Sequence, residues 1–219
     1  GCIGFIGSHL CEALLKRGHQ VIGLDNFDPF YDPSKKEAHL RTLLGHVDFQ
    51  FIEMDLTDPI WFQEDMGWHH VGLVIHLAAK VGVRDSINHS EEYFQTNVFG
   101  LQNLIDWMRS AGVSQIIHAS SSSVYGKQRF ARDSTRETAD GSALLGHPLN
   151  EDSRLNPLNP YAESKVQAEK LLNSQLDLQA IHLRFFSVYG PRQRPDLLFP
   201  KILKHIERGS SLEVYGDGS

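Results

Sequence analysis

A tyrosine and a lysine four residues apart, Tyr161 and Lys165, are the strongest candidates for chemistry in this sequence. Residues at this spacing lie on one face of a helix, so the ammonium group of the lysine would lie beside the phenol. A neighbouring positive charge favours the phenolate and lowers the pKa of a tyrosine from its ordinary value of about 10. Such a group can take a proton from a hydroxyl near neutral pH. The pair predicts a general base, and ordinary packing of a helix face is the alternative.

Three glycines at the start of the chain have the spacing of a phosphate-binding loop. The run GCIGFIGSHL has the form G-x-x-G-x-x-G and leads directly into a predicted helix. Glycines let the backbone approach a pyrophosphate, and the amide groups of a helix N-terminus face its negative charge. A plain turn before a helix is the alternative, because this spacing alone is weak evidence. The residues expected to line the loop are Gly1, Gly4, Phe5, Ile6 and Gly7.

Acidic residues follow two of the predicted strands. Asp25 stands 18 residues after Gly7, at the end of a strand predicted over 20–24. A carboxylate there accepts hydrogen bonds from the hydroxyls of an adenosine ribose and repels a 2′-phosphate, which favours NAD over NADP. Asn26 follows it, and Asp55 and Leu56, after the next predicted strand, are placed to contact the adenine. Simple loop capping is the alternative for all of these positions.

Strand-length apolar runs alternate with longer segments of helical period, which predicts an α/β fold with a doubly wound parallel sheet. The expected strands cover 20–24, 49–53, 73–76, 115–119 and 180–183. The expected helices cover 8–17, 59–65, 91–111 and 160–176. The polar segment 127–156 has no convincing period and predicts a long loop.

The chain is expected to hold one domain and the start of another. We assign residues 1–186 to a Rossmann domain that binds NAD, and 187–219 to the beginning of a substrate-binding lobe. A helix is expected over 198–208 and a short strand over 212–215. Because a dinucleotide-binding fold normally has a strand before its glycines, we expect the first strand to be missing. We also expect the lobe that begins at residue 187 to be truncated.

The composition argues against several function classes. A formal net charge of -6 disfavours binding of nucleic acid, which depends on clustered Lys and Arg. No segment approaches about 18 consecutive apolar residues, so no membrane span is expected. Two cysteines make no disulfide framework, and no secretion signal is visible, so we expect a cytoplasmic protein. The 12 histidines share no ligand spacing, so no metal site is expected.

Four segments together resemble the extended short-chain dehydrogenase/reductase family, and within it the NAD-dependent epimerases and dehydratases. They are the glycine loop, HLAA at 76–79, SSSSVYG at 120–126 and YAESK at 161–165. The combination is far more specific than any one of them. The resemblance implies a Rossmann fold, NAD as the cofactor, and catalysis by Ser121, Tyr161 and Lys165. In this family the tyrosine takes a proton from a sugar hydroxyl while hydride passes to NAD. Hydride then returns to the opposite face of the keto intermediate.

The resemblance also implies roles for residues outside this catalytic set. Leu77, Ala78, Ala79 and Asn97 would contact the cofactor, as would Tyr161 and Lys165. The residues expected to contact a UDP-sugar are Arg84, Ser122, Ser123, Ser187 and Arg194, the last by pairing with the diphosphate. A solvated charge is the alternative for Arg194, and a solvent-facing side chain for Asn97. The family usually forms homodimers through two helices, here 91–111 and 160–176.

The side chains that follow Ser121 help to choose among the activities of the family. Dehydratases carry an Asp-Glu pair there, whereas this chain has Ser122 and Ser123, so we rank a 4,6-dehydratase below a 4-epimerase. The segments 24–34, 79–86 and 184–191 resemble UDP-glucuronate 4-epimerases most, which favours UDP-glucuronate and puts UDP-glucose next. Arg192-Gln193 stands where that subfamily has Trp-Gly, which leaves the neutral sugars open. A non-catalytic NAD-binding module and an oxidoreductase that releases NADH are further alternatives.

Overall fold

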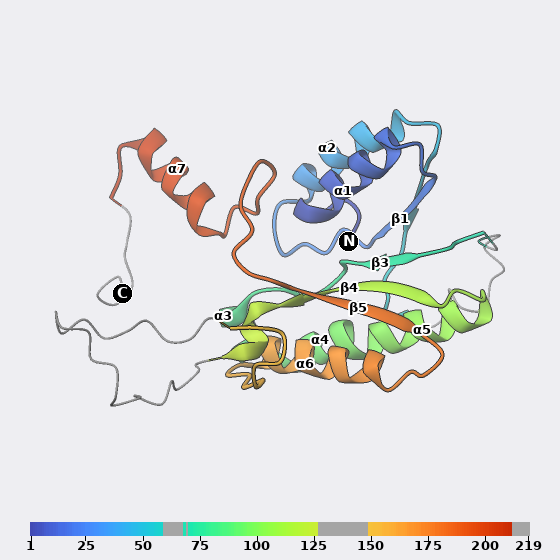
Figure 1. Cartoon of the computed structure of the whole chain (residues 1–219). Coiled ribbons are helices and arrows are strands. Elements are labelled where there is room, and N and C mark those ends of the chain that lie inside the picture. The colour runs from blue at the N-terminus through green and yellow to red at the C-terminus, as the bar shows by residue number, and fades with distance from the viewer. Residues whose placement is uncertain (59–67, 69, 127–148, 212–219) are drawn as a thin grey trace, which may run out of the picture. The chain divides into compact units, whose positions relative to one another are not determined.

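The computed structural model describes residues 1–58, 68, 70–126 and 149–211, and Figure 1 shows its helices and strands. The helix expected over 59–65, the strand over 212–215 and most of the loop over 127–156 lie outside these residues. The chain divides into two compact units. The first contains Gly1–Gly67, Ile75–Ala79 and Ser187–Ser219, and the second contains Trp68–Val74 and Lys80–Phe186. The assignment of 1–186 and 187–219 to separate domains stays a prediction.

The first unit is built around two parallel strands. Its elements are α1 (Phe5–Lys16), β1 (Val21–Asp25), α2 (Pro33–Leu44), β2 (Phe49–Glu53) and α7 (Leu198–Arg208). The strands pair in register from Val21 opposite Phe49 to Asp25 opposite Glu53. Apolar side chains of the glycine loop, α1, α2 and β2 form a core, which contains Ile3, Cys11, Leu15, Leu43 and Phe49.

Helix α2 was not predicted from the sequence. It begins because Asp32 accepts a hydrogen bond from the backbone N–H of Ser34 at 3.0 Å, and because Pro33 occupies its first turn. The helix has only two buried residues, Lys36 and Leu43, so its apolar period is weak. The pair Asp32-Pro33 was the signal that could have found it.

The second unit places helices against parallel strands. It contains α3 (Val83–Asn88), α4 (Ser90–Phe94), a π-helical turn (Gln95–Phe99), α5 (Gly100–Ser110), β4 (Gln115–Ser121), a 3-10 turn (Ser122–Tyr125), α6 (Pro160–Asn173) and β5 (Gln179–Phe185). Strands β4 and β5 pair in register from Gln115 opposite Gln179 to Ser121 opposite Phe185. Figure 1 shows α4, α5 and α6 together on one face of these two strands. Asn159 caps α6 by accepting from the N–H of Ala162 at 2.9 Å.

The predicted parallel α/β architecture is confirmed, and its strands form two sheets. One has the order β1-β2 and the other β3-β4-β5, where β3 is Val74–His76. No helix among the described residues is long and apolar enough to span a bilayer.

The boundaries of the predicted elements agree with the structure to within three residues, with one difference in kind. The five strands predicted between residues 20 and 183 form, and the helices predicted over 160–176 and 198–208 correspond to α6 and α7. The helix predicted over 8–17 begins earlier, at Phe5, because Gly7 lies inside the first turn of α1. The helix predicted over 91–111 is interrupted by the π-helical turn. The short helix α3 was not predicted.

Candidate active site

The three glycines of the first loop are required for different reasons. A Cβ added to Gly7 would lie 2.1 Å from the carbonyl oxygen of Gly1, and one added to Gly1 would lie 2.6 Å from the backbone nitrogen of Ala78. Close backbone packing inside the protein therefore excludes a side chain at both positions. A Cβ at Gly4 would meet only the Gly1 carbonyl oxygen, at 3.3 Å, and the φ of Gly4 is -71°. Little within the protein demands glycine there, so the bare backbone is free for a ligand.

The loop leads straight into α1, as the spacing predicted. Gly4 is the N-cap, and Phe5, Ile6 and Gly7 form the first turn, with no acidic side chain in it. The amide of Ser8 donates to the carbonyl oxygen of Gly4 at 3.0 Å. The amides before it lie at the positive end of the helix, where an anion is stabilised. Leu77 and Ala79 flank Ala78 in the segment that packs on Gly1, and all three are partly exposed.

Asp25 ends β1 and is buried, with 5% of its surface exposed. Its Oδ1 accepts from the backbone N–H of Phe27 at 3.0 Å and from Lys36 Nζ at 3.1 Å, and its Oδ2 lies 3.4 Å from the amino group of Gly1. Burial raises the pKa of Asp25, whereas the charge of Lys36 and the hydrogen bonds from Lys36 and the Phe27 N–H lower it. The carboxylate is therefore ionised, which the predicted acceptance of two ribose hydroxyls requires. The contribution of Lys36 was missed from the sequence, together with the helix that carries it.

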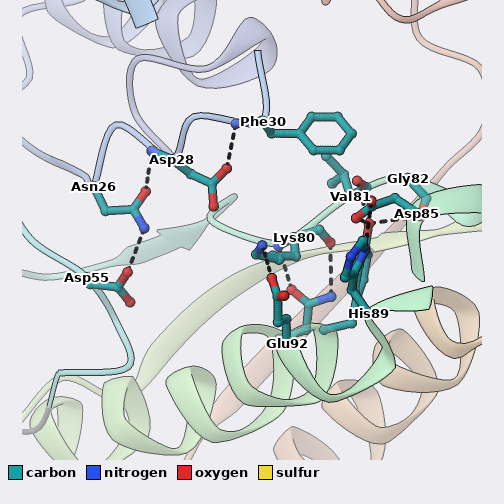
Figure 2. Close-up of polar contacts among 12 residues, drawn as sticks. Asn26, Asp28, Phe30, Asp55, Lys80, Val81, Gly82, Asp85, His89 and Glu92 are labelled. Carbon is teal, nitrogen blue, oxygen red and sulfur yellow. Dashed lines mark hydrogen bonds and ion pairs between the residues drawn. The ribbon is translucent and has the colours of Figure 1, made fainter. Parts of the chain in front are cut away.

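Asn26 and Asp55 are linked at the ends of the two strands of this unit. Asn26 Nδ2 donates to Asp55 Oδ2 at 2.7 Å, and Asp55 Oδ1 accepts from the N–H and the hydroxyl of Thr57 at 2.8 and 2.7 Å. Figure 2 shows this pair with the successive turns at Asp28 and Phe30. Leu56, next to Asp55, is buried. The predicted adenosine-side residues Asp25, Asn26, Asp55 and Leu56 are thus all in the first unit, where hydrogen bonds hold the three polar ones.

Tyr161 and Lys165 lie on α6 in the second unit. Lys165 is buried, with 3% exposed, and its Nζ donates to the carbonyl oxygen of Ala119 on β4 at 2.9 Å. Burial lowers the pKa of Lys165 to about 8, although the charge of Glu169 acts in the opposite direction. The ring of Tyr161 makes an edge contact with the buried ring of Tyr93, with centroids 6.2 Å apart. The helix therefore fixes both residues of the predicted proton-transfer pair.

Ser121 is the last residue of β4, two residues beyond the acceptor of the Lys165 hydrogen bond. Its Oγ accepts from the backbone N–H of Ser123 at 3.2 Å and from the Ser123 hydroxyl at 2.9 Å, so it caps the 3-10 turn. Ser122 and Ser123 are partly exposed and carry no charge. A network of hydroxyls thus stands at the end of β4, where the sequence predicted the catalytic serine and its two substrate-contacting neighbours.

Asn97 is buried in the π-helical turn and connects the loop at Lys80 to helix α6. Its Oδ1 accepts from the backbone N–H of Lys80 at 2.8 Å, and its Nδ2 donates to the Lys80 carbonyl oxygen at 3.1 Å. The same Nδ2 donates to Ser164 Oγ on α6 at 2.9 Å. Figure 2 shows the contacts around Lys80, including its ion pair with Glu92. Burial rules out the alternative of a solvent-facing side chain, and a contact with NAD stays a prediction.

A second buried carboxylate, Glu169 on α6, was not predicted from the sequence. Glu169, with 2% exposed, forms a bidentate pair with Arg184 of β5, at 3.0 Å from Nε to Oε1 and 2.8 Å from Nη2 to Oε2. Ser120 also donates to Oε1, and Arg184 Nη1 donates to the Tyr125 hydroxyl at 3.0 Å. A signal existed, because an arginine within the apolar strand AIHLRFF needs a buried partner.

The remaining predicted substrate residues occupy loops and a short helix. Arg84, on α3 of the second unit, is exposed, and so is Ser187 in the first unit. Arg194, also in the first unit, lies 3.2 Å from Asp196 and stacks on Phe30, with its guanidinium carbon 5.2 Å from the ring centroid. None of these contacts tests a role in binding a sugar or a diphosphate, so these roles stay predictions.

Comparison with known proteins agrees with the resemblance seen in the sequence. The model of the NAD dependent epimerase/dehydratase family matches residues 1–219. The chain is 37% identical over 226 residues to an uncharacterised UDP-glucose epimerase, YtcB, of Bacillus subtilis (strain 168). It is 33% identical over 223 residues to a UDP-glucuronate 4-epimerase of Thermodesulfobacterium geofontis (strain OPF15). In both cases the match covers 100% of this chain and 64% of the relative.

A solved structure with bound ligands has the same fold. It is the UDP-glucuronic acid 4-epimerase of Bacillus cereus in complex with UDP-glucuronic acid and NAD. The TM-score is 0.84 with 32% sequence identity, and the match covers 100% of this chain and 65% of that one. The chain therefore spans slightly less than two thirds of the length of the proteins it matches.

Proposed function

Because the chain belongs to the NAD-dependent epimerase/dehydratase family, we propose that it inverts C4 of a UDP-sugar through a 4-keto intermediate, with NAD as its cofactor. The observation that carries the proposal is the arrangement around α6. A buried Lys165, fixed to the end of β4 by its hydrogen bond to Ala119, lies one helical turn from Tyr161. Ser121 ends the same strand. These are the three side chains that the reaction needs.

The first unit carries the features that would hold the adenosine diphosphate part of NAD. Gly4 leaves bare backbone at the N-terminus of α1, which suits a pyrophosphate. Ionised Asp25 suits the hydroxyls of a ribose, and Leu56 with the Asn26–Asp55 pair suits the adenine. When bound, NAD accepts hydride from the sugar carbon and returns it. The residues present therefore fit the cofactor that the family implies.

The second unit carries the groups that would move the proton. In this proposal Tyr161 accepts the proton of the C4 hydroxyl, and Ser121 hydrogen-bonds the same oxygen. Lys165, whose pKa is about 8, carries a positive charge at neutral pH that stabilises the phenolate of Tyr161. The edge contact with Tyr93 restricts the Tyr161 ring and so helps to position its oxygen.

The side chains after Ser121 favour epimerisation over elimination of water. Removal of water needs an acid and a base beside the sugar, whereas Ser122 and Ser123 offer only hydroxyls. Among the UDP-sugars, UDP-glucuronate is favoured, since serine hydroxyls can hydrogen-bond its carboxylate and two of the relatives above act on UDP-glucuronate. UDP-glucose is the second candidate, as named for the Bacillus subtilis relative.

The test incubates the purified full-length protein separately with UDP-glucuronate, UDP-glucose and UDP-N-acetylglucosamine and resolves the products by chromatography. A 4-epimer without accumulation of NADH is the expected result. Tyr161→Phe should lower turnover at least a hundredfold while leaving NAD binding nearly unchanged, because only the proton acceptor is lost. A 4-keto-6-deoxy product would identify a dehydratase instead. Near-normal turnover of the variant would remove Tyr161 from the mechanism.

A further inference from the structure

Lys36 is a buried lysine in a place where stability alone does not favour one. Only 6% of its surface is exposed, and it is the fourth residue of α2 after the cap at Asp32. A buried ammonium group is costly unless it is paired, and the positive end of the helix dipole adds to that cost. The sequence offers exposed lysine at the preceding position, Lys35, so the helix itself does not require a buried one.

The surroundings of Lys36 show what compensates for its burial. Its Nζ lies 3.1 Å from Asp25 Oδ1 and 5.6 Å from the centroid of the Tyr31 ring. Asp25 is therefore its anionic partner, and the aromatic face adds a weaker cation–π attraction. The same carboxylate is the group expected to accept the hydroxyls of the adenosine ribose. One residue thus serves as ligand acceptor and as counterion.

We propose that Lys36 is a latent phosphate-binding group that Asp25 masks, so that the pair sets the choice between a 2′-hydroxyl and a 2′-phosphate on the adenosine ribose. The inference rests on the proposed binding of NAD. With Asp25 present, the ammonium is neutralised and the carboxylate repels a phosphate. With Asp25 removed, a buried cation is left without its partner at the position where a 2′-phosphate would supply the missing negative charge.

The test measures binding rather than turnover. Isothermal titration calorimetry gives the affinities of ADP-ribose and of 2′-phospho-ADP-ribose for the full-length protein and its variants. The wild type should prefer ADP-ribose, and Asp25→Ala should reverse the preference by at least tenfold. The double variant Asp25→Ala/Lys36→Met should lose the increase in affinity for 2′-phospho-ADP-ribose that Asp25→Ala brings. The matched control Asp25→Ala/Lys35→Met should keep it, because Lys35 is exposed.

The ratio of the two affinities separates this role from a structural one. If Lys36 only stabilised the fold, its replacement would lower the affinities for both ligands by the same factor. Equal affinity ratios for Asp25→Ala and Asp25→Ala/Lys36→Met would therefore overturn the inference. If Asp25→Ala does not fold, Asp25→Asn and Asp25→Asn/Lys36→Met give the same comparison with smaller changes in volume. A wild type that binds neither ligand would overturn the proposed cofactor as well. A wild type that binds ADP-ribose without a reversal in the variants would overturn only the role of Lys36.

Discussion

Two buried carboxylates, one in each compact unit, are satisfied in different ways. Glu169 has both oxygens occupied by the guanidinium of Arg184, and one of them also accepts from Ser120. Asp25 has one oxygen occupied, by Lys36 and a backbone amide, while the other lies 3.4 Å from an amino group. Both side chains are less than a tenth exposed.

The difference separates a structural carboxylate from one suited to recognition. A bidentate arginine fixes the plane of a carboxylate and uses most of its hydrogen-bonding capacity, whereas a lysine is a point charge that leaves an oxygen available. Burial and a charged partner are therefore no sign of a ligand site by themselves. What marks Asp25 is the acceptor capacity that remains at the end of β1, next to the glycine loop.

The largest effect is expected for Glu169→Ala, which leaves Arg184 without its partner. Removing one member of a buried ion pair costs about 3 to 5 kcal/mol of unfolding free energy, because the other charge stays uncompensated. Urea denaturation would measure this loss. Glu163→Ala on the same helix is the control, since Glu163 is partly exposed and accepts a hydrogen bond from Gln167 at 2.9 Å. A loss below 1 kcal/mol for Glu169→Ala would contradict the structural role.

Lys165 should show the cost of a buried charge whose direct contact is a backbone carbonyl oxygen, that of Ala119. Its pKa is lowered by burial from 10.5 to about 8, so between these values the unfolded chain binds more protons than the folded one. The free energy of unfolding should therefore rise with pH across this window, by on the order of 3 kcal/mol. The difference between wild type and Lys165→Met isolates this contribution, and Lys170→Met, at an exposed position of α6, is the control. A flat difference from pH 8 to 10.5 would show that Lys165 is solvated.

The pH dependence of the unfolding free energy of Glu169→Gln tests whether the charge of Glu169 stabilises the protein. Burial raises the pKa of Glu169, but the hydrogen bonds from Arg184 and Ser120 outweigh it and lower the pKa below the ordinary 4.5. The ionised form therefore adds stability above about pH 4.5, and this is lost as the pH falls through the lower folded value. The free energy of unfolding of the wild type should exceed that of the variant at pH 7, and the difference should narrow below pH 4.5. A gap independent of pH would mean that shape rather than charge holds the pair.

The strands and helix α6 were predicted from the sequence because local patterns determine them. Apolar runs bounded by polar residues located β2 and β4, and the run Pro160 to Lys165 located the start of α6. The spacing G-x-x-G-x-x-G located the loop before α1, and the residues 120–126 located the serines after β4. Each of these signals lies within a few consecutive residues, so no knowledge of tertiary contacts was needed.

The contacts that hold the candidate site could not be predicted, because they join distant segments. Glu169 and Arg184 come from different elements, and Asn97 meets Ser164 across 67 residues. The π-helical turn that carries Asn97 has no recognisable pattern in QTNVF. Helix α2 could not be predicted from its apolar period because its composition is polar. The burial of Lys36 could not be predicted either, because a lysine in a polar segment is expected to be exposed. The pairing of the strands into two sheets could not be predicted either, since the apolar period of a strand does not say which strand it pairs with.

The smallest effect on stability is expected for Arg109 and Asp177, a bidentate pair on the surface with the same geometry as Arg184 and Glu169. Arg109 binds Asp177 with two hydrogen bonds, from Nε to Oδ2 at 2.8 Å and from Nη2 to Oδ1 at 3.1 Å, yet both side chains are more than 40% exposed. Water and salt screen such a pair, so Asp177→Asn should leave the Tm within experimental error. The measurement is thermal unfolding at low and at 0.5 M salt, about the concentration at which surface charges are well screened, beside Glu169→Gln. If Asp177→Asn and Glu169→Gln lowered the Tm equally, bidentate geometry alone would account for the stabilising effect of Glu169. A difference between them would assign its effect to burial, which is the property that Asp25 shares.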